Sequence, residues 1–261
     1  MEYKWAAGSD VGIRKKVNQD SLLLESKIMK NGNGDKKYII LAVVCDGVGG
    51  LSEGEWASAA AVRLMQSWAR DMLPELFVRG KLQVSSMKAS LNNVLRDINR
   101  KIIDRSEDAS SGTTLCGIII VDDHFYTINV GDSRAYRIRG GSAERLTKDQ
   151  TVLQEDLDSG AITPDRIKEH PHPHMLTHCI GTEASVSMVY TEGGILPGDV
   201  FIVCSDGFYG TMTDDDLALH LSPELLRSKE DSSNQIGYCI SEVKRRKEKD
   251  NISVIVLKAE G

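Results

Sequence analysis

The sequence lacks any long hydrophobic run. Its longest apolar stretch, Tyr38 to Cys45, is far shorter than the roughly 20 residues that cross a bilayer. Residues 1–10 contain no apolar segment followed by a cleavage site. We therefore expect a cytoplasmic protein that makes no contact with a membrane.

Cysteine is scarce and irregularly placed. The chain has an odd number of cysteines and no Cys-x-x-Cys pair, which argues against a disulfide framework and a zinc ribbon. Most of them lie in apolar, strand-like runs, so we expect reduced thiols buried in the core. The five residues are Cys45, Cys116, Cys179, Cys204 and Cys239.

Aromatic residues and positive charge are both in short supply. Aromatics make up 5% of the chain, and the formal net charge is −6. Nucleic acids are usually bound by a basic surface and, when single-stranded, by stacking on aromatic side chains. The composition therefore argues against a nucleic-acid partner and against a two-metal nuclease. The basic run from Lys244 to Lys247 is interpreted as a helix C-terminus, whose cations complement the helix dipole.

The composition otherwise is that of a globular protein. Hydrophobic residues make up 41% and charged residues 27% of 261 residues, and no Pro-, Ser- or Gly-rich tract marks a linker. This predicts one layered domain over residues 1–261. A monomer is the default expectation.

Two periodic segments predict amphipathic helices. Apolar residues recur at i, i+3 and i+4 from Ala57 to Met72 and again from Val84 to Ile102. Short runs rich in Val and Ile, bounded by Gly, Asp or Asn, predict strands at Tyr38–Cys45, Leu115–Val121, Phe125–Val130, Val200–Cys204 and Ile252–Leu257. Strands cluster and helices come in pairs, which favours an α+β fold of antiparallel sheets with helices outside.

Two segments between the predicted strands and helices contain residues typical of turns and loops. Asp122-Asp123 separates two predicted strands and reads as a hairpin turn. Residues 149–175 are acidic, contain proline and are weakly periodic, with candidate helix starts at Lys148 to Gln150 and at Thr163-Pro164. We interpret this second segment as a mobile flap over a site.

Aspartates recur at the ends of the predicted strands. Asp46, Asp132 and Asp206 each follow a hydrophobic strand closely, and Asp250 precedes the last one. A single Asp after a strand is usually a turn residue. Strand ends lie side by side, however, so four aspartates can converge, and their repulsion would require a hard cation such as Mg²⁺ or Mn²⁺. Nearby glycines would let the backbone approach the ion: Gly47, Gly49 and Gly50.

Three other patterns suggest rival sites. A nucleotide-binding loop is excluded because the glycines are not followed by Gly-Lys-Ser/Thr. Cys239 and Arg245 have the Cys-x5-Arg spacing of a cysteine phosphatase, but the residues between them contain no glycine and read as helix. A histidine group suggests zinc, yet its alternation with proline gives no helical i, i+4 pair, so we expect surface or flap contacts: His170, His172, His174 and His178.

The motifs, taken in order, resemble those of the PPM family, the type 2C metal-dependent protein phosphatases. The matching segments are Asp10-Val11-Gly12, Asn18-Gln19-Asp20, Asp46-Gly47-Val48-Gly49-Gly50, Ser111-Gly112-Thr113-Thr114, Gly131-Asp132-Ser133-Arg134, Leu146-Thr147-Lys148-Asp149, Leu176-Thr177-His178, Ser205-Asp206-Gly207 and Asp250-Asn251. The resemblance implies a four-layer α-β-β-α sandwich. It also implies hydrolysis of phosphoserine and phosphothreonine in proteins by a metal-activated water.

The resemblance implies a role for individual residues. Asp46, Asp206 and Asp250 would bind a pair of Mn²⁺ or Mg²⁺ ions, and the carbonyl oxygen of Gly47 would bind one of the two. Asp20 would contribute through a metal-bound water. The implied partners are phosphoserine and phosphothreonine proteins, including a serine/threonine kinase and its substrates.

Three positions need separate comment. Asp132 resembles the family's ligand for a third, weaker ion, shared with Asp206. Lys15 stands where the family commonly has a phosphate-binding arginine, and Arg14 is the alternative clamp. Val48 replaces a histidine proposed as general acid in some members, and valine has no proton to donate. These departures leave open a catalytically weak homologue that binds phosphoproteins as a signalling module.

Overall fold

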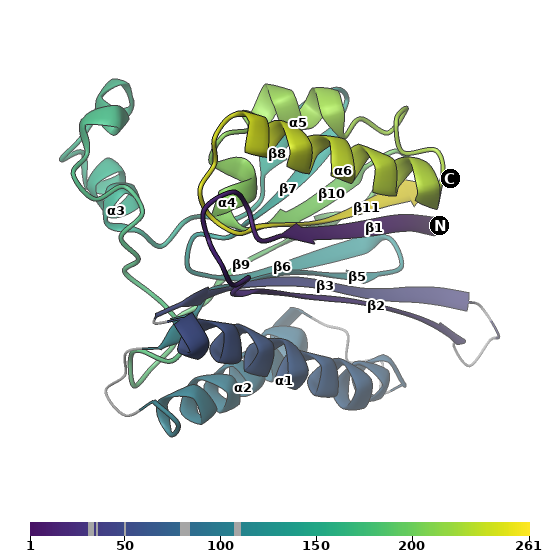
Figure 1. The fold of residues 1–261 in the computed structure, drawn as a ribbon. Coiled ribbons are helices and arrows are strands. Elements are labelled where there is room, and N and C mark those ends of the chain that lie inside the picture. Colours follow the sequence, from purple (N-terminus) through teal and green to yellow (C-terminus); the bar gives the residue numbers. More distant parts are fainter. Residues whose placement is uncertain (31–33, 35, 50, 79–83, 107–110) are drawn as a thin grey trace.

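The computed structural model describes residues 1–30, 34, 36–49, 51–78, 84–106 and 111–261. Two antiparallel sheets lie face to face, and helices cover the outer side of each (Figure 1). This is the predicted α+β sandwich of four layers.

The first sheet has the strand order β2-β3-β5-β6-β9 and carries the short strand β4 beside β3. Its strands are β2 (Asp20–Lys30), β3 (Lys36–Val48), β4 (Gly112–Thr113), β5 (Leu115–Val121), β6 (His124–Val130) and β9 (Val189–Gly194). The predicted turn at Asp122-Asp123 joins β5 to β6, where Asp122 has a positive φ of 60°.

The second sheet has the order β1-β11-β10-β7-β8. Its strands are β1 (Glu2–Asp10), β7 (Arg134–Arg139), β8 (Ser142–Arg145), β10 (Val200–Cys204) and β11 (Ile252–Glu260). Strand β11 lies between the N-terminal strand and β10, so the two ends of the chain lie together at one end of the sandwich (Figure 1).

The helices divide between the two outer layers. α1 (Leu51–Val78) and α2 (Val84–Ile103) cover the first sheet, while α5 (Asp214–His220) and α6 (Lys229–Arg245) cover the second (Figure 1). α6 ends at Arg245, which confirms that the basic run marks a helix C-terminus. Within the described residues, no helix is both long and apolar enough to cross a lipid bilayer.

Three apolar layers hold the sandwich together because each central strand is buried on both faces. In β3, Leu41 and Val43 pack against α1 and α2, whereas Ala42 and Val44 face the second sheet. A third cluster joins the second sheet to its helices. All five cysteines are buried and unbonded, as expected.

Strand β3 is longer than its apolar run predicts. The prediction ended the strand at Cys45, but Gly47 and Val48 pair with Thr113 and Gly112 of β4. Asp46 therefore lies within a strand and not in the turn after it.

The segment 149–175 leaves the sandwich at the end opposite the chain termini (Figure 1). It contains α3 (Val152–Ser159), capped by the Thr151 side chain, and a 3-10 helix at Pro164–Glu169. The second helix begins at the predicted Pro164, and α3 begins just after the predicted start. The short helix α4 (Asp206–Tyr209) lies at the same end of the molecule (Figure 1).

Candidate metal centre

Two of the predicted aspartates face each other across neighbouring strands. Asp20 is the first residue of β2, and the register places it opposite Asp46 of β3. Cβ atoms of such cross-strand partners lie about 5 Å apart, and two like charges there destabilise the pair. Ser205 Oγ donates a hydrogen bond of 2.9 Å to Asp20 Oδ2, which satisfies one oxygen of this pair.

The second sheet delivers Asp206 and Asp250 to the same edge. Asp206 is the first residue of α4, directly after β10, and Asp250 lies just before β11. Gly207 permits this approach, because a Cβ atom there would lie 2.0 Å from the carbonyl oxygen of Asn251. Only glycine lets the two segments come this close.

The backbone around Asp46 is equally crowded. A Cβ atom on Gly47 would lie 2.2 Å from the carbonyl oxygen of Gly54 and 2.8 Å from that of Gln19. Gly49 has a positive φ of 127°, which also favours glycine. Gly50, the third glycine of the motif, lies outside the described residues.

The converging residues line one cavity of about 600 Å³ at the strand ends. Lys15 lines it, whereas Arg14 does not and is exposed. Asp20 lies behind the surface of this cavity, next to Asp46. The acidic and main-chain groups predicted for metal binding are all present in its wall: Asp46, Gly47, Asp132, Asp206 and Asp250.

The carboxylates are strained electrostatically without a cation. Burial, and then the neighbouring acids, raise the pKa of Asp46 well above its ordinary value and the pKa of Asp132 to about 8. The same causes raise the pKa of Asp206 and bring that of Asp20 to about 6. A divalent cation would reverse these shifts by compensating the negative charge.

Two carboxylate oxygens have no partner at all among the described residues. They are the buried Oδ1 atoms of Asp20 and Asp206. Buried polar atoms are nearly always hydrogen-bonded or bound to an ion, so unpartnered carboxylate oxygens in an acidic cluster are suited to bind a cation or a water. The donor set consists of carboxylate and carbonyl oxygens, which suits Mn²⁺ and Mg²⁺.

Lys15 is held at the rim by the same cluster. Its Nζ atom lies 2.8 Å from Oδ1 of Asp250. Burial lowers the pKa of Lys15, but the hydrogen bond and the charge of Asp250 outweigh this, so the net shift is upward and the ammonium stays charged. Asn251 fixes the loop that carries Lys15, because its Nδ2 atom donates to the carbonyl oxygens of Val11 and Val17.

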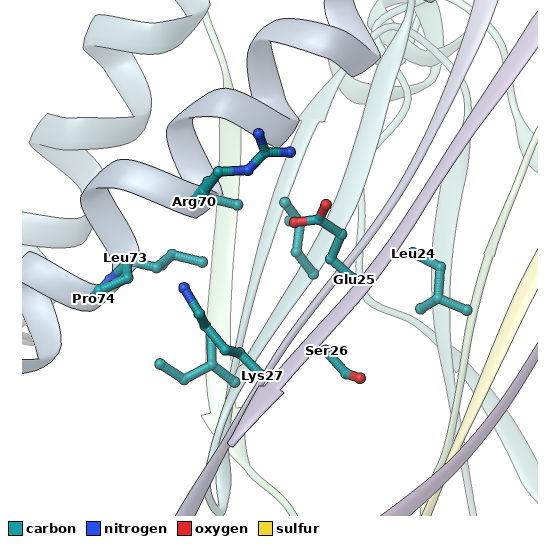
Figure 2. A pocket seen from close by; sticks show the side chains of 10 residues that line it. Leu24, Glu25, Ser26, Lys27, Arg70, Leu73 and Pro74 are labelled. Carbon is teal, nitrogen blue, oxygen red and sulfur yellow. The ribbon is translucent and has the colours of Figure 1, made fainter. Parts of the chain in front are cut away.

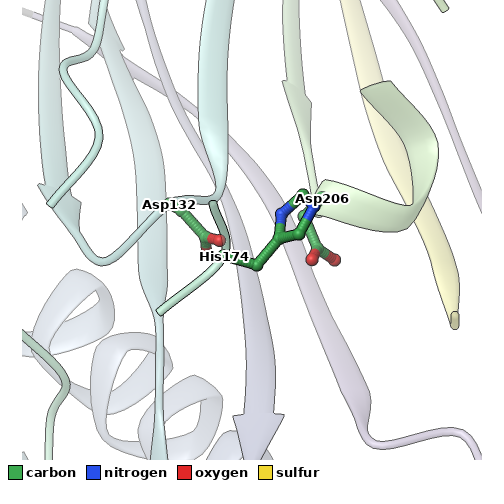
Figure 3. A group of neighbouring side chains, drawn as sticks. All are labelled: Asp132, His174 and Asp206. Atoms are coloured by element: carbon green, nitrogen blue, oxygen red, sulfur yellow. The ribbon is translucent and has the colours of Figure 1, made fainter. Parts of the chain in front are cut away.

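His174 joins the acids from the segment 149–175, which the histidine pattern did not predict. One ligand atom each from Asp132, His174 and Asp206 lie within 4.8 Å of one another (Figure 3). His170 instead contacts Asp156, at 3.0 Å from its Nε2 atom. The expectation of flap contacts therefore describes His170, while His174 reaches the acidic cluster.

The cysteine-phosphatase alternative fails on the structure. Cys239 is buried in the middle of α6, where burial raises the pKa of its thiol to about 12. A nucleophilic cysteine requires a lowered pKa and a loop that surrounds the phosphate.

A second cavity, of about 410 Å³, lies between β2 and α1 (Figure 2). Glu25 is the one acid in its wall, and it accepts a hydrogen bond from Gln66 Nε2. Because strands rise about 3.3 Å per residue, Leu24 to Lys27 are roughly 13 Å or more from Asp20. This cavity offers no set of metal ligands, so the strand-end cavity is the candidate centre.

A sandwich with an acidic, oxygen-rich cavity at its strand ends suits an enzyme that uses divalent cations. A family model described as protein phosphatase 2C matches residues 8–237. The chain therefore belongs to the protein phosphatase 2C family of metal-dependent serine/threonine protein phosphatases.

Individual proteins that are similar to this chain are also named serine/threonine phosphatases. The serine/threonine phosphatase stp of Listeria innocua serovar 6a is 27% identical over 229 residues, which is 86% of each chain. The S. agalactiae serine/threonine phosphatase superposes with a TM-score of 0.81 at 25% identity, covering 99% of this chain and 100% of that one. The catalytic domain of the phosphatase PstP, in complex with 2 manganese ions, has a TM-score of 0.75 at 24% identity and 99% coverage of both chains.

Proposed function

We propose that this chain hydrolyses phosphoserine and phosphothreonine in proteins at a dinuclear centre of Mn²⁺ or Mg²⁺. Asp46, Asp206 and Asp250 would hold the ions, together with the carbonyl oxygen of Gly47. The observation that carries the proposal is the buried Oδ1 atom of Asp206, which lacks a partner among the described residues inside a converging set of aspartates. The two manganese ions in the related PstP structure support the same number of ions here.

When bound, two divalent ions supply Lewis-acid polarisation of the phosphoryl group and a water of lowered pKa. Asp20 supports this chemistry from behind Asp46. Ser205 fixes one of its carboxylate oxygens at 2.9 Å, while the other receives no donor from the described residues. That oxygen can accept a hydrogen bond from a water and orient it.

Lys15 would bind the phosphate of the substrate. Its ammonium group lies in the cavity wall and is charged, as an anion-binding group must be. Arg14 is outside the cavity, so we assign the clamp to Lys15 alone. Val48, also in the wall, cannot protonate the leaving alkoxide, so that proton must come from water.

We further propose that the chain acts as a single catalytic domain and a monomer in the cytoplasm. Its five unbonded thiols are usual for a reducing compartment. Its substrates would be the phosphorylated products of a serine/threonine kinase, and the kinase itself where it carries such phosphates. The net charge of −6 gives no support to a nucleic-acid substrate.

The direct test is release of phosphate from a phosphoserine or phosphothreonine peptide by protein freed of metal with EDTA. We expect no turnover in the absence of metal and saturable turnover as Mn²⁺ is added. A phosphotyrosine peptide serves as the control and should be a poor substrate. Mn²⁺ binding without phosphate release would instead support the alternative function, a phosphoprotein-binding module. The presence of Lys15 where the family commonly has arginine is the feature that favours this alternative.

A further inference from the structure

The segment 149–175 reaches the acidic cluster through one side chain. His174 lies beside Asp132, which follows β6, and Asp206, which begins α4 (Figure 3). One ligand atom of each lies within 4.8 Å of the other two. Three stretches of chain that are distant in sequence therefore meet at one point.

This point lies between two cavities. The strand-end cavity has Asp132 and His174 in its wall, and so does a neighbouring cavity of about 570 Å³. The neighbouring cavity is also lined by other residues of the segment 149–175, including Leu157 and Lys168. A group bound between Asp132 and His174 would therefore connect that segment to the sandwich.

The acids at this point are deeply placed and poorly compensated. Asp132 is 5% exposed, and the Oδ1 atom of Asp206 is buried with no partner in the described part of the chain. The nearby cation Arg134 is committed elsewhere, since its Nη2 atom lies 2.6 Å from Asp149 Oδ2 and its guanidinium stacks on Tyr209. A cation from solution would compensate both carboxylates at once.

We propose that His174 is a ligand of an accessory cation held by Asp132 and Asp206. The inference rests on the proposed metal centre and adds a nitrogen ligand to it. Imidazole binds transition ions more readily than Mg²⁺, which prefers oxygen donors and its own waters. His174 therefore makes this site select Mn²⁺ over Mg²⁺, and cation binding fixes the segment 149–175 against the sandwich.

Pulsed electron paramagnetic resonance of Mn²⁺ tests this directly, because a coordinated imidazole imposes modulations from its ¹⁴N nucleus on the Mn²⁺ signal. Calorimetric titration of the same samples with Mn²⁺ and with Mg²⁺ gives the affinity of each site. His174→Ala is the test variant, and His172→Ala is the matched control from the same histidine-proline run. Both side chains are exposed, so neither change should affect folding.

We expect ¹⁴N modulations in the unchanged protein and in His172→Ala, and their loss in His174→Ala. In His174→Ala, the affinity of the weakest site for Mn²⁺ should fall about tenfold or more, the usual cost of changing a residue that holds or orients a metal ligand. The affinity of this site for Mg²⁺ should change less. Absence of ¹⁴N modulation from protein saturated with Mn²⁺, or modulation that survives in His174→Ala, would overturn the inference and leave the dinuclear centre intact. Failure to bind Mn²⁺ at all would overturn both.

Discussion

Lys15 Nζ lies 2.8 Å from Oδ1 of Asp250, so the proposed phosphate clamp is paired with a proposed metal ligand. The two roles compete for one carboxylate. A cation bound by Asp250 would weaken its hold on Lys15 and release the ammonium group for an incoming phosphate. In the proposed mechanism, the pair would link metal loading to substrate binding.

Lys15→Ala should lower kcat/KM for a phosphopeptide by roughly 10- to 100-fold, which is the worth of one hydrogen bond to a charged group. Arg14→Ala is the control, because Arg14 carries the same charge one residue away but lies outside the cavity. It should stay within about twofold of the unchanged protein, a range that a mere change of surface charge permits. Steady-state kinetics at saturating Mn²⁺ decides between them. An equal fall in kcat/KM in both variants would contradict the assignment of Lys15 as the phosphate-binding residue.

Asn251→Ala should raise KM for the phosphopeptide by releasing the loop that carries Lys15. The Oδ1 atom of Asn251 accepts a hydrogen bond of 2.9 Å from the backbone N–H of Gln19, and its Nδ2 atom donates the two hydrogen bonds to that loop. Loss of such a buried network should cost about 1–3 kcal/mol in free energy of unfolding.

Thr127→Ala is the control for Asn251→Ala. Thr127 is also buried, and its Oγ1 atom accepts a hydrogen bond from the backbone N–H of Thr191, away from the residues that line the strand-end cavity. Urea denaturation should show a similar loss of stability in both variants, while KM changes only in Asn251→Ala. An unchanged KM in Asn251→Ala would show that the loop is held by other contacts.

Gly207→Ala should destabilise the protein by roughly 1–3 kcal/mol, the usual cost of forcing a methyl group into a packed site. The added Cβ atom would lie 2.0 Å from the carbonyl oxygen of Asn251 and push apart the segments that carry Asp206 and Asp250. Gly237→Ala in α6 has open space around it and should instead stabilise by about 0.5–1 kcal/mol. Thermal unfolding that shifts both variants in the same direction would contradict the crowding argument.

The metal-free protein should lose stability as pH rises, because of Asp132. Its pKa is raised to about 8 in the folded state, mainly by burial, against about 4 in the unfolded chain. The folded state therefore binds more protons between these values, and stability falls as the pH rises through the window from about 4 to 8.

Asp132→Asn removes this proton and should remove part of that pH dependence. In EDTA, its free energy of unfolding relative to the unchanged protein should rise by about 1 kcal/mol or more from pH 5 to pH 8, the equivalent of one pKa unit. Asp71→Asn, at an exposed position on α1, should show no such trend. Parallel pH curves for all three proteins in urea denaturation would refute the assignment.

The central layers of the fold could be predicted from the sequence because burial on two faces gives an unmistakable pattern. β5 and β10 were predicted to the residue, since every position in them is buried. β2 was missed because it lies at the edge of its sheet, and its second half is exposed, including Ile28 at 54%. β7 was not predicted because its arginines interrupt the apolar pattern of a buried strand. One of them, Arg139, forms an ion pair with Asp199.

The acidic part of the site was also readable in the chain, because the four aspartates recur at strand ends. The contribution of His174 could not be predicted, because its segment shows no helical or strand periodicity from which the direction of a side chain could be inferred. Ordinary spacing arguments gave the histidines only flap or surface contacts. A contact between His174 and Asp132 depends on the path of a long connection, which local sequence does not specify.

The most direct measurement is Mn²⁺-dependent phosphate release by Asp206→Asn from a phosphoserine peptide. Asp206 is assigned to both the proposed dinuclear centre and the proposed accessory site, so its loss should reduce kcat by about 10³-fold or more, the scale of one preorganised charge in a phosphoryl-transfer site. Circular dichroism should show an unchanged fold, and Asp71→Asn should retain full activity. Near-normal Mn²⁺-dependent turnover by Asp206→Asn would contradict the account of a metal centre built from these aspartates.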